Sequence, residues 1–410
     1  MPYFLSVLAA AAQIATVPAS TPLIHPGDKI ALCGDSITEQ RQYSRIIETY
    51  LRACQPDLNV EFRQYGWSGE TWDGFLARMD QDVLRFKPTL SLTLYGMNDH
   101  RYVAYDPAIV TAYIKNMENG IVKFQRAGSR VVICSPNSIG KIPPWAGKAT
   151  VAQMNDHLTK MSRACMITAA RNQVNFIDNN AVMNRAARKG KKWFGSDYTL
   201  EGSDGVHPNW AGHMVMAYAV LKGLGVSGDL GTITVNLRGE GHALASGGHK
   251  VVSVHKGTIT LMSSRYPFYI PREDVRSNQT LASGAALVPF QRDLNRFTLV
   301  LKHPKKSLYR VAWGASAHIF TAAQLEHGIN LPVEFSVNPL TQPFMEIDHA
   351  VAAKQSFETT EVKNLFRTDS TADGLRGVTK DAEAIRDQLV FAIKKRQTPI
   401  THTITITFFR

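Results

Sequence analysis

The chain is poor in cysteine, which excludes a fold held together by a disulfide framework. Four cysteines occur in 410 residues, too few for such a framework in a chain of this length. Their spacing does not suggest a zinc site. Cys33 and Cys134 end two apolar runs, which predicts buried free thiols rather than reactive ones. If the protein is exported, one disulfide bond between two of these cysteines remains possible.

The chain also lacks a long apolar segment, internal repeats and low-complexity tracts. The apolar run near the N-terminus is shorter than the apolar segment that a transmembrane helix needs, and no other stretch of the chain comes near that length. Residues 1–19 instead resemble a signal peptide, because the apolar run is followed by small residues up to Ala19. The usual Lys or Arg at the start is missing. We therefore expect a soluble exported protein, periplasmic or extracellular.

The composition is that of an ordinary globular protein, with 44% hydrophobic and 20% charged residues. The length allows two domains. A formal net charge of +12 favours acidic partners in general, without choosing among them. The short basic clusters at residues 185–192, 302–306 and 394–396 have no nucleic-acid-binding signature beside them, so we interpret them as solvated surface and expect no nucleic acid partner.

Strand and helix patterns alternate from residue 22 to about residue 225. The expected strands lie at 29–33, 60–64, 90–95, 130–135 and 174–177, and the expected helices at 39–52, 72–86, 106–127, 151–171 and 209–224. This alternation favours a parallel sheet covered by helices on both faces, with ligands bound beyond the carboxyl ends of the strands.

The pattern changes after residue 225. Short alternating runs then predict strands at 232–237, 250–254, 258–262, 296–301, 309–313 and 333–337. Helical patterns follow at 348–366 and 379–396, and a strand pattern at 401–409 ends the chain. We expect an α/β domain at 20–228, a β-rich accessory region at 229–345 and a helical C-terminal segment at 346–410 that ends in a strand. The last helices can also pack back against the first domain, so the pattern does not fix a clean division into two domains.

The stretch Gly34-Asp35-Ser36-Ile37-Thr38 lies between the first strand and the first helix. A serine near a helix N-terminus meets unpaired N–H groups and the positive end of the helix dipole, which favour developing negative charge. Asp and Ser are also common helix caps. This stretch alone therefore predicts either a nucleophile or a cap at Ser36.

Asp204 and His207 lie in one loop just before the last helix of the first domain. Histidine is the usual base for a serine hydroxyl, and an acid that binds its other ring nitrogen selects the tautomer. An Asp and a His at a helix start are more often capping residues. Their occurrence together with Ser36 favours a catalytic triad.

Gly69, within Ser68-Gly69-Glu70-Thr71, and Asn98, within Gly96-Met97-Asn98-Asp99, follow the second and third strands. We expect both at the same edge of the sheet as Ser36. The N–H groups of Ser36 and Gly69 and the amide of Asn98 then supply three donors for an oxyanion. In isolation, either residue would be interpreted as a turn residue.

The four blocks around Ser36, Gly69, Asn98 and the Asp204/His207 pair resemble the marker blocks of the SGNH hydrolases, also called the GDSL family, in the family's order. The resemblance covers residues 22–225, about half of the chain. It implies a flavodoxin-like three-layer α/β/α fold, no metal or organic cofactor, and ester or thioester hydrolysis through an acyl-enzyme. By matching motif, Ser36 is the nucleophile, His207 the base and Asp204 its orienting acid. Asp35 is left as a structural turn residue.

Trp67, Tyr95 and Trp145 lie near the expected mouth of the site, where aromatic faces can stack on sugar rings. A Trp in a loop is more often a packing residue. Together with the signal-peptide-like residues 1–19 and the four marker blocks, these aromatic residues predict an exported esterase that removes acetyl groups from carbohydrate. The alternatives are a lipase, phospholipase or thioesterase of the same family, an O-acetyltransferase, and a noncatalytic glycan-binding protein.

Overall fold

The computed structural model describes residues 22–238, 242–368 and 372–408, apart from the side chains of residues 372–375. The predicted signal peptide at residues 1–19 lies outside the described residues. Within the described part, no helix combines the length and apolarity needed to cross a membrane.

The first part of the chain is built on a five-stranded parallel sheet with the order β2-β1-β3-β4-β5. Its strands are β1 (Lys29–Gly34), β2 (Glu61–Gly66), β3 (Leu90–Leu94), β4 (Arg130–Cys134) and β5 (Asn175–Ile177). This is the strand order of flavodoxin-like doubly wound sheets. The predicted fold class is confirmed.

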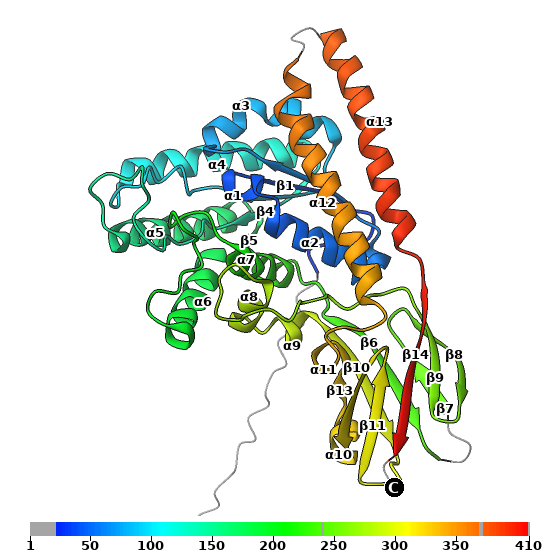
Figure 1. Cartoon of the computed structure of the whole chain (residues 1–410). Coiled ribbons are helices and arrows are strands. Elements are labelled where there is room, and N and C mark those ends of the chain that lie inside the picture. The colour runs from blue at the N-terminus through cyan, green and yellow to red at the C-terminus, as the bar shows by residue number, and fades with distance from the viewer. Residues whose placement is uncertain (1–21, 239–241, 369–371, 409–410) are drawn as a thin grey trace, which may run out of the picture.

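Helices cover both faces of this sheet (Figure 1). They are α1 (Ser36–Glu39), α2 (Gln42–Ala53), α3 (Trp72–Asp82), α4 (Pro107–Arg126), α5 (Val151–Arg171), α6 (Asn179–Phe194) and α7 (Trp210–Gly223), with 3-10 turns at Pro56–Leu58 and Leu84–Phe86. Alternate residues of β1 point to opposite faces. Ile30 and Leu32 pack in the cluster that holds α2 and α7, whereas Ala31 and Cys33 pack in the cluster that holds α3 and α4.

The sequence pattern does not predict α6. Met183, Ala186 and Gly190 are buried at helical spacing, but this apolar face is made largely of small residues and is interrupted by the basic side chains that the sequence analysis interpreted as solvated surface. The basic cluster at 185–192 lies on this helix. By contrast, α5 begins and ends where the pattern predicts, and Thr150 and Gln153 form a capping box that fixes its start.

The second part of the chain contains two further sheets, with the orders β13-β10-β6-β7 and β12-β11-β14-β9-β8. The strands are β6 (Asp229–Asn236), β7 (His242–Ala245), β8 (His249–His255), β9 (Thr258–Ser263), β10 (Arg296–Lys302), β11 (Leu308–Trp313), β12 (Ser316–Thr321), β13 (Ile329–Asn330) and β14 (Ile400–Phe408). Buried residues of the first sheet, such as Phe297 and Leu299, share a core with Trp313 and Ile404 of the second. The β-rich accessory region is confirmed.

The strand expected at 333–337 is wrong. The short helix α11 (Leu331–Glu334) lies there, and Pro332 occupies its first turn, where the missing N–H costs nothing. The other short helices of this part are α8 (Leu281–Leu287), α9 (Phe290–Leu294) and α10 (Ala322–His327).

The last two helices, α12 (Thr341–Lys363) and α13 (Ala372–Arg396), pack against the first part of the chain, as Figure 1 shows, with a 3-10 turn at Leu365–Arg367 between them. The chain then returns as β14, which pairs with β9 and β11 inside the β-rich region. The predicted helical segment is therefore interleaved with both other parts. The domain boundaries at residues 228 and 345 stay predictions.

Side chains of α12 and α13 cover the free edge of β2. The backbone carbonyl of Phe62 accepts hydrogen bonds from Lys354 Nζ at 2.5 Å and from Arg386 Nη2 at 3.0 Å. The Gln64 N–H donates to Glu358 Oε2 at 3.3 Å. An edge strand exposes unpaired backbone groups, so these contacts both satisfy it and fix the helices on the sheet.

All four cysteines are buried and free. Burial raises the pKa of the Cys134 and Cys165 thiols to about 12, which disfavours the reactive thiolate. The prediction of buried free thiols is confirmed.

Candidate active site

Ser36 lies at the carboxyl edge of the sheet, where β1 ends and α1 begins. Asp35 caps α1, since its Oδ1 accepts a hydrogen bond from the Ile37 N–H at 3.0 Å. The turn is tight at Gly34, where a Cβ would lie 2.1 Å from Thr38 Oγ1. The cap and the serine are thus separate residues: Asp35 holds the turn, as expected, and Ser36 is the first residue of the helix.

His207 connects Ser36 to Asp204. The His207 Nε2 lies 2.7 Å from Ser36 Oγ, and its Nδ1 lies 2.6 Å from Asp204 Oδ2. With the proton on Nδ1, the ring donates to Asp204 and accepts from the serine hydroxyl. This arrangement can take a proton from Ser36 as the serine attacks an ester carbonyl.

The loop that carries Asp204 and His207 is fixed by its own hydrogen bonds. Asp204 Oδ1 accepts from the backbone N–H groups of Val206 and His207, both at 2.9 Å. Gly205 has φ +84°, and a Cβ there would lie 2.4 Å from the carbonyl oxygen of Lys141. Only glycine fits this close approach, so the tight turn requires it.

The carboxyl of Asp204 is held in its charged form. Partial burial would raise its pKa, but hydrogen bonds from the backbone and ring of His207 and from the Val206 N–H outweigh this effect and lower the pKa below its ordinary value. A charged Asp204 stabilises the imidazolium that forms when His207 takes a proton.

Two of the expected oxyanion donors come from the turns after β2 and β3. Gly69 has φ +75°, a left-handed conformation that glycine adopts without strain. The Asn98 side chain donates from Nδ2 to the backbone carbonyl of Glu70 at 3.1 Å. This contact links the turn of Asn98 to the turn of Gly69 on the same edge of the sheet as Ser36.

Tyr102 is a residue that the sequence analysis did not single out. Its hydroxyl donates to Asn98 Oδ1 at 3.1 Å, so the amide of Asn98 is held at both ends. Its ring packs on His100, with 4.6 Å between the ring centroids, and meets Trp145 edge to face. Its spacing of four residues from Asn98 is a weak signal, because the two residues lie in an irregular loop rather than on a helix.

An open hollow of about 470 Å³ lies in front of Ser36, Asp204 and His207. Its remaining lining is polar and includes Glu39, Arg41 and Ser68. Such a lining suits a hydroxylated substrate better than a long acyl chain, which would need an apolar channel.

The three predicted substrate-binding aromatics differ in position. Trp145 is 50% exposed, and its ring centroid lies 5.9 Å from that of His207, so it lies at the site. Tyr95 is 1% exposed and donates its hydroxyl to Glu70, which contradicts the predicted contact with substrate. Tyr95 follows the end of β3, and its ring packs against Trp72 and Phe75 of α3 rather than facing the hollow.

The ring of Trp67 is half-buried and is already in contact with cations. Arg78, Lys363 and Arg367 lie 5.1, 5.2 and 5.3 Å from its centroid. These cation–π contacts leave little free face for a sugar ring. The structure therefore does not support stacking of substrate on Trp67.

Segments beyond residue 225 reach the rim of the hollow. Lys363 on α12 pairs with Glu39 at 2.7 Å, and Arg41 donates to Thr359 on the same helix at 3.2 Å. On the other side, Asn278 accepts a hydrogen bond from Asn209 at 3.1 Å, two residues after His207. No local pattern could predict these contacts, because their partners lie far away along the chain.

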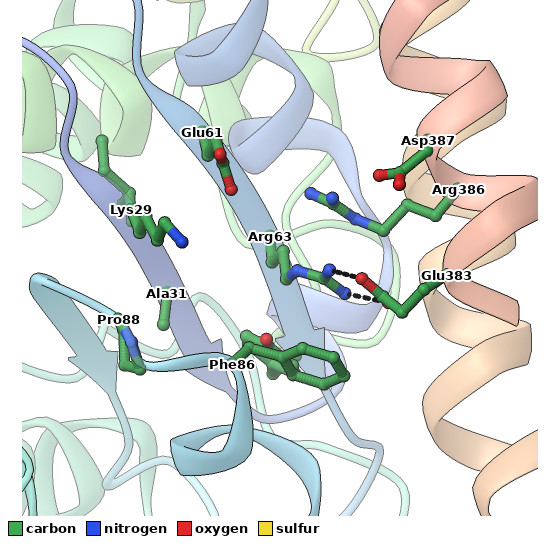
Figure 2. A pocket seen from close by; sticks show the side chains of 11 residues that line it. Lys29, Ala31, Glu61, Arg63, Phe86, Pro88, Glu383, Arg386 and Asp387 are labelled. Atoms are coloured by element: carbon green, nitrogen blue, oxygen red, sulfur yellow. Dashed lines mark hydrogen bonds and ion pairs between the residues drawn. The ribbon is translucent and has the colours of Figure 1, made fainter. Parts of the chain in front are cut away.

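A second, charged crevice of about 160 Å³ lies between α13 and the sheet (Figure 2). It includes Lys29 and Glu61, the first residues of β1 and β2. Parallel strands start at the edge opposite to the one where they end, so this crevice is away from Ser36. Among its charged lining residues, Arg63 and Glu383 form an ion pair.

Comparison with known proteins agrees with this geometry. The model of the GDSL-like Lipase/Acylhydrolase family matches residues 32–215. An acetylxylan esterase from Geobacillus stearothermophilus is 23% identical over 228 residues, which cover 49% of this chain and 96% of that protein.

Among solved structures, a gut microbial diltiazem-metabolizing enzyme is similar over 94% of this chain and 98% of its own, with a TM-score of 0.77 and 22% identity. This likeness shows that the whole arrangement, including the β-rich region and the final helices, is a shared fold. A structure of the Geobacillus stearothermophilus acetylxylan esterase covers 49% of this chain and 96% of its own, with a TM-score of 0.41 and 22% identity.

Proposed function

Because the chain belongs to the SGNH hydrolase superfamily and is an ester-hydrolysing enzyme, we propose that it removes short acyl groups, chiefly acetyl, from carbohydrate through an acyl-enzyme on Ser36. The observation that carries the proposal is the hydrogen-bonded chain from Ser36 through His207 to Asp204, with contacts of 2.7 and 2.6 Å.

In the proposed acylation step, Ser36 Oγ attacks the ester carbonyl carbon while its proton passes to His207 Nε2. The C–O bond to the sugar then breaks, and His207 returns the proton to the departing sugar oxygen. Water next attacks the acyl-serine, His207 takes a proton from this water, and the carboxylic acid leaves as the proton returns to Ser36. Asp204 stays ionised throughout and holds the ring.

The tetrahedral intermediates place negative charge on the former carbonyl oxygen. The proposed donors to this oxygen are the N–H groups of Ser36 and Gly69 and the Nδ2 of Asn98. Within the described residues, no hydrogen bond engages either N–H group. Donors that are fixed before the reaction stabilise the developing charge without reorganisation.

Two observations support a small acyl group on a sugar. The hollow at Ser36 is open and polar, which favours hydroxylated substrates over long hydrocarbon chains. A relative that matches 49% of the chain is named an acetylxylan esterase. We also propose that the protein is exported, since a polysaccharide substrate lies outside the cell and residues 1–19 resemble a signal peptide.

The test compares wild type with Ser36→Ala on acetylated xylan and on 4-nitrophenyl esters of increasing chain length. We expect wild type to release acetate and to prefer the acetyl ester, and Ser36→Ala to lose about 10⁴-fold or more of kcat. This loss is expected because Ser36→Ala lacks the nucleophilic hydroxyl. The thermal unfolding of the variant should match that of wild type.

A preference for long acyl esters would overturn the carbohydrate proposal in favour of a lipase or thioesterase. Transfer of acetyl to an added sugar in place of hydrolysis would identify an acetyltransferase. Glycan binding by both proteins without turnover by either would identify a noncatalytic binding protein.

A further inference from the structure

A second pocket, of about 260 Å³, lies where three distant parts of the chain meet. The first domain contributes Arg45 on α2 and Trp210 at the start of α7. The segment before α8 contributes Tyr269 and Glu273, and α12 contributes Asp348 and His349. The pocket therefore exists only in the complete fold.

This pocket lies beside the hollow at Ser36, because residues close together in the chain line the two cavities. Arg41, the residue before α2, lines the hollow, and Arg45 in the first turn of α2 lines the pocket. Asn209 lines the hollow and the next residue, Trp210, lines the pocket. A chain-like ligand bound at Ser36 can thus continue into the pocket.

One side of the pocket is rigid and charged. The Arg45 Nε donates to Asp348 Oδ1 at 2.9 Å, and Thr49 Oγ1 donates to the same oxygen at 3.0 Å. The guanidinium carbon of Arg45 lies 5.8 Å from the centroid of the Trp210 ring. These contacts fix α12 against α2 and hold the wall in place.

The rest of the lining combines aromatic faces with unpaired polar groups. Trp210 and Tyr269 are half-buried, and the pocket floor includes the buried Phe268. Within the described part of the chain, the side chains of Glu273 and His349 make no hydrogen bond or ion pair. Sugar rings present apolar C–H faces and a rim of hydroxyls, so aromatic rings beside free acceptors and donors match this chemistry.

We propose that this pocket binds a sugar unit of the glycan whose acetyl ester lies at Ser36, so that the accessory region and α12 supply a distal subsite. The inference rests on the proposed function. The pocket is near the lower end of the size range of small-molecule sites, which suits one ring and not a larger ligand.

The test measures kcat and KM on acetylated xylose, xylobiose, xylotriose and xylotetraose, and on the corresponding glucose series. For wild type we expect kcat/KM to rise with chain length until the distal unit reaches the pocket. In Tyr269→Ala we expect the KM of the longer substrates to rise about tenfold, because an aromatic contact is lost. The kcat and the hydrolysis of 4-nitrophenyl acetate should stay unchanged.

Two variants serve as controls. Tyr269→Phe keeps the ring and should keep most of the length dependence. Trp193→Ala removes an aromatic that is 54% exposed on α6, outside both hollows, and should behave as wild type. Equal kcat/KM at all lengths in both series, or a length dependence that survives in Tyr269→Ala, would overturn the inference.

Calorimetry with unacetylated xylotetraose and cellotetraose separates this inference from the proposed function. Binding to wild type that Tyr269→Ala weakens about tenfold supports the pocket even if no acetylated glycan is hydrolysed, in which case only the proposed function fails. Undetectable binding to wild type, or equal binding to both proteins, counts against the pocket even if acetate is released.

Discussion

At the scale of single residues, Asn98 shows how the site is held before any substrate arrives. Its amide donates to the Glu70 carbonyl at 3.1 Å and accepts from the Tyr102 hydroxyl at 3.1 Å. A donor that is already oriented loses little entropy when charge develops on the substrate. Its share of the proposed activity can therefore be measured by removing it.

We expect Asn98→Ala to lower kcat by about 10²- to 10³-fold with little change in KM, because the amide acts on the oxyanion and not on the bound ester. Steady-state kinetics on 4-nitrophenyl acetate measure both quantities. Thermal unfolding provides the control, since the variant also loses the contacts with Glu70 and Tyr102. An unchanged kcat in a folded variant would remove Asn98 from the proposed oxyanion hole.

Asp35 has a different task from its neighbour Ser36. It is fully buried, and burial raises the pKa of its carboxyl to about 7, with the charges of Asp99 and Glu70 adding to this effect. One of its oxygens caps α1, and the other has no hydrogen-bond partner within the described residues. A residue so enclosed shapes the turn and does not contact substrate.

At the scale of elements, α12 fastens the C-terminal segment to the first part of the chain through buried charges. Lys354 and Glu358 are fully or almost fully buried, and Lys354 contacts both Glu48 and Glu358 at 2.9 Å. Removing one member of such a buried ion pair leaves an uncompensated buried charge, which is strongly destabilising. These charges make the position of α12 specific, and α12 in turn forms part of the rim at Ser36.

The contact between α12 and α13 includes two carboxyls, Glu361 and Glu383, that face Arg63 (Figure 2 shows Glu383 and Arg63). Burial raises the pKa of Glu361 to about 8, and the neighbouring carboxyl of Glu383 adds to this. A carboxyl whose pKa is raised by folding contributes stability that is present below its ordinary pKa and is lost as the pH rises through about 8.

We therefore expect the urea concentration at the unfolding midpoint of wild type to decrease as the pH is raised from about 6 to about 9. The corresponding loss in unfolding free energy is on the order of 2 kcal/mol. In Glu361→Gln, which cannot ionise, this decline should be smaller. Equilibrium unfolding at both pH values measures the difference. The same decline in both proteins would show that Glu361 is not its cause.

At the scale of the whole molecule, the β-rich region is closed by its last strand. β14 lies between β9 and β11, although α12 and α13 separate it from them in the chain. A hydrogen-bonded path then crosses this region: Trp313 donates to His402, His402 meets Ser263 at 2.8 Å, and Ser263 meets His249 at 2.7 Å. His249 continues to the Leu230 carbonyl in the other sheet at 2.9 Å.

Burial lowers the pKa of both His249 and His402 to about 4, so the path requires neutral rings. A histidine whose pKa is lowered by folding contributes stability that is complete above its ordinary pKa of about 6.5 and is lost as the pH falls towards 4. The loss is up to about 3 kcal/mol for each ring.

We expect His402→Asn to be less stable than wild type at neutral pH and to lose less on acidification to about pH 5, because one titrating ring is gone. Asn keeps an acceptor for the Trp313 N–H. Urea unfolding at the two pH values measures both slopes. Their difference reports the loss of His402 from this path, since Asp35 and Glu361 titrate in both proteins. Parallel slopes would exclude His402 as a source of the acid loss.

The sequence by itself determined the features that depend on local chemistry. The period of the apolar residues specified the alternating strands and helices. The blocks around Ser36, Gly69, Asn98 and the Asp204/His207 pair, placed between those strands and helices, predicted one edge of one sheet. They did so because parallel strands deliver the ends of distant segments to the same edge.

Only the tertiary structure decided which side chains face the substrate side and what completes the rim. Tyr95 and Trp145 are both aromatics near the expected mouth, yet one is enclosed by helices and the other is half exposed. Contacts such as Lys363 with Glu39, and the pocket between Arg45, Tyr269 and Asp348, join residues that lie far apart in the chain. Such contacts follow from the packing of whole elements, which no local pattern in the chain encodes.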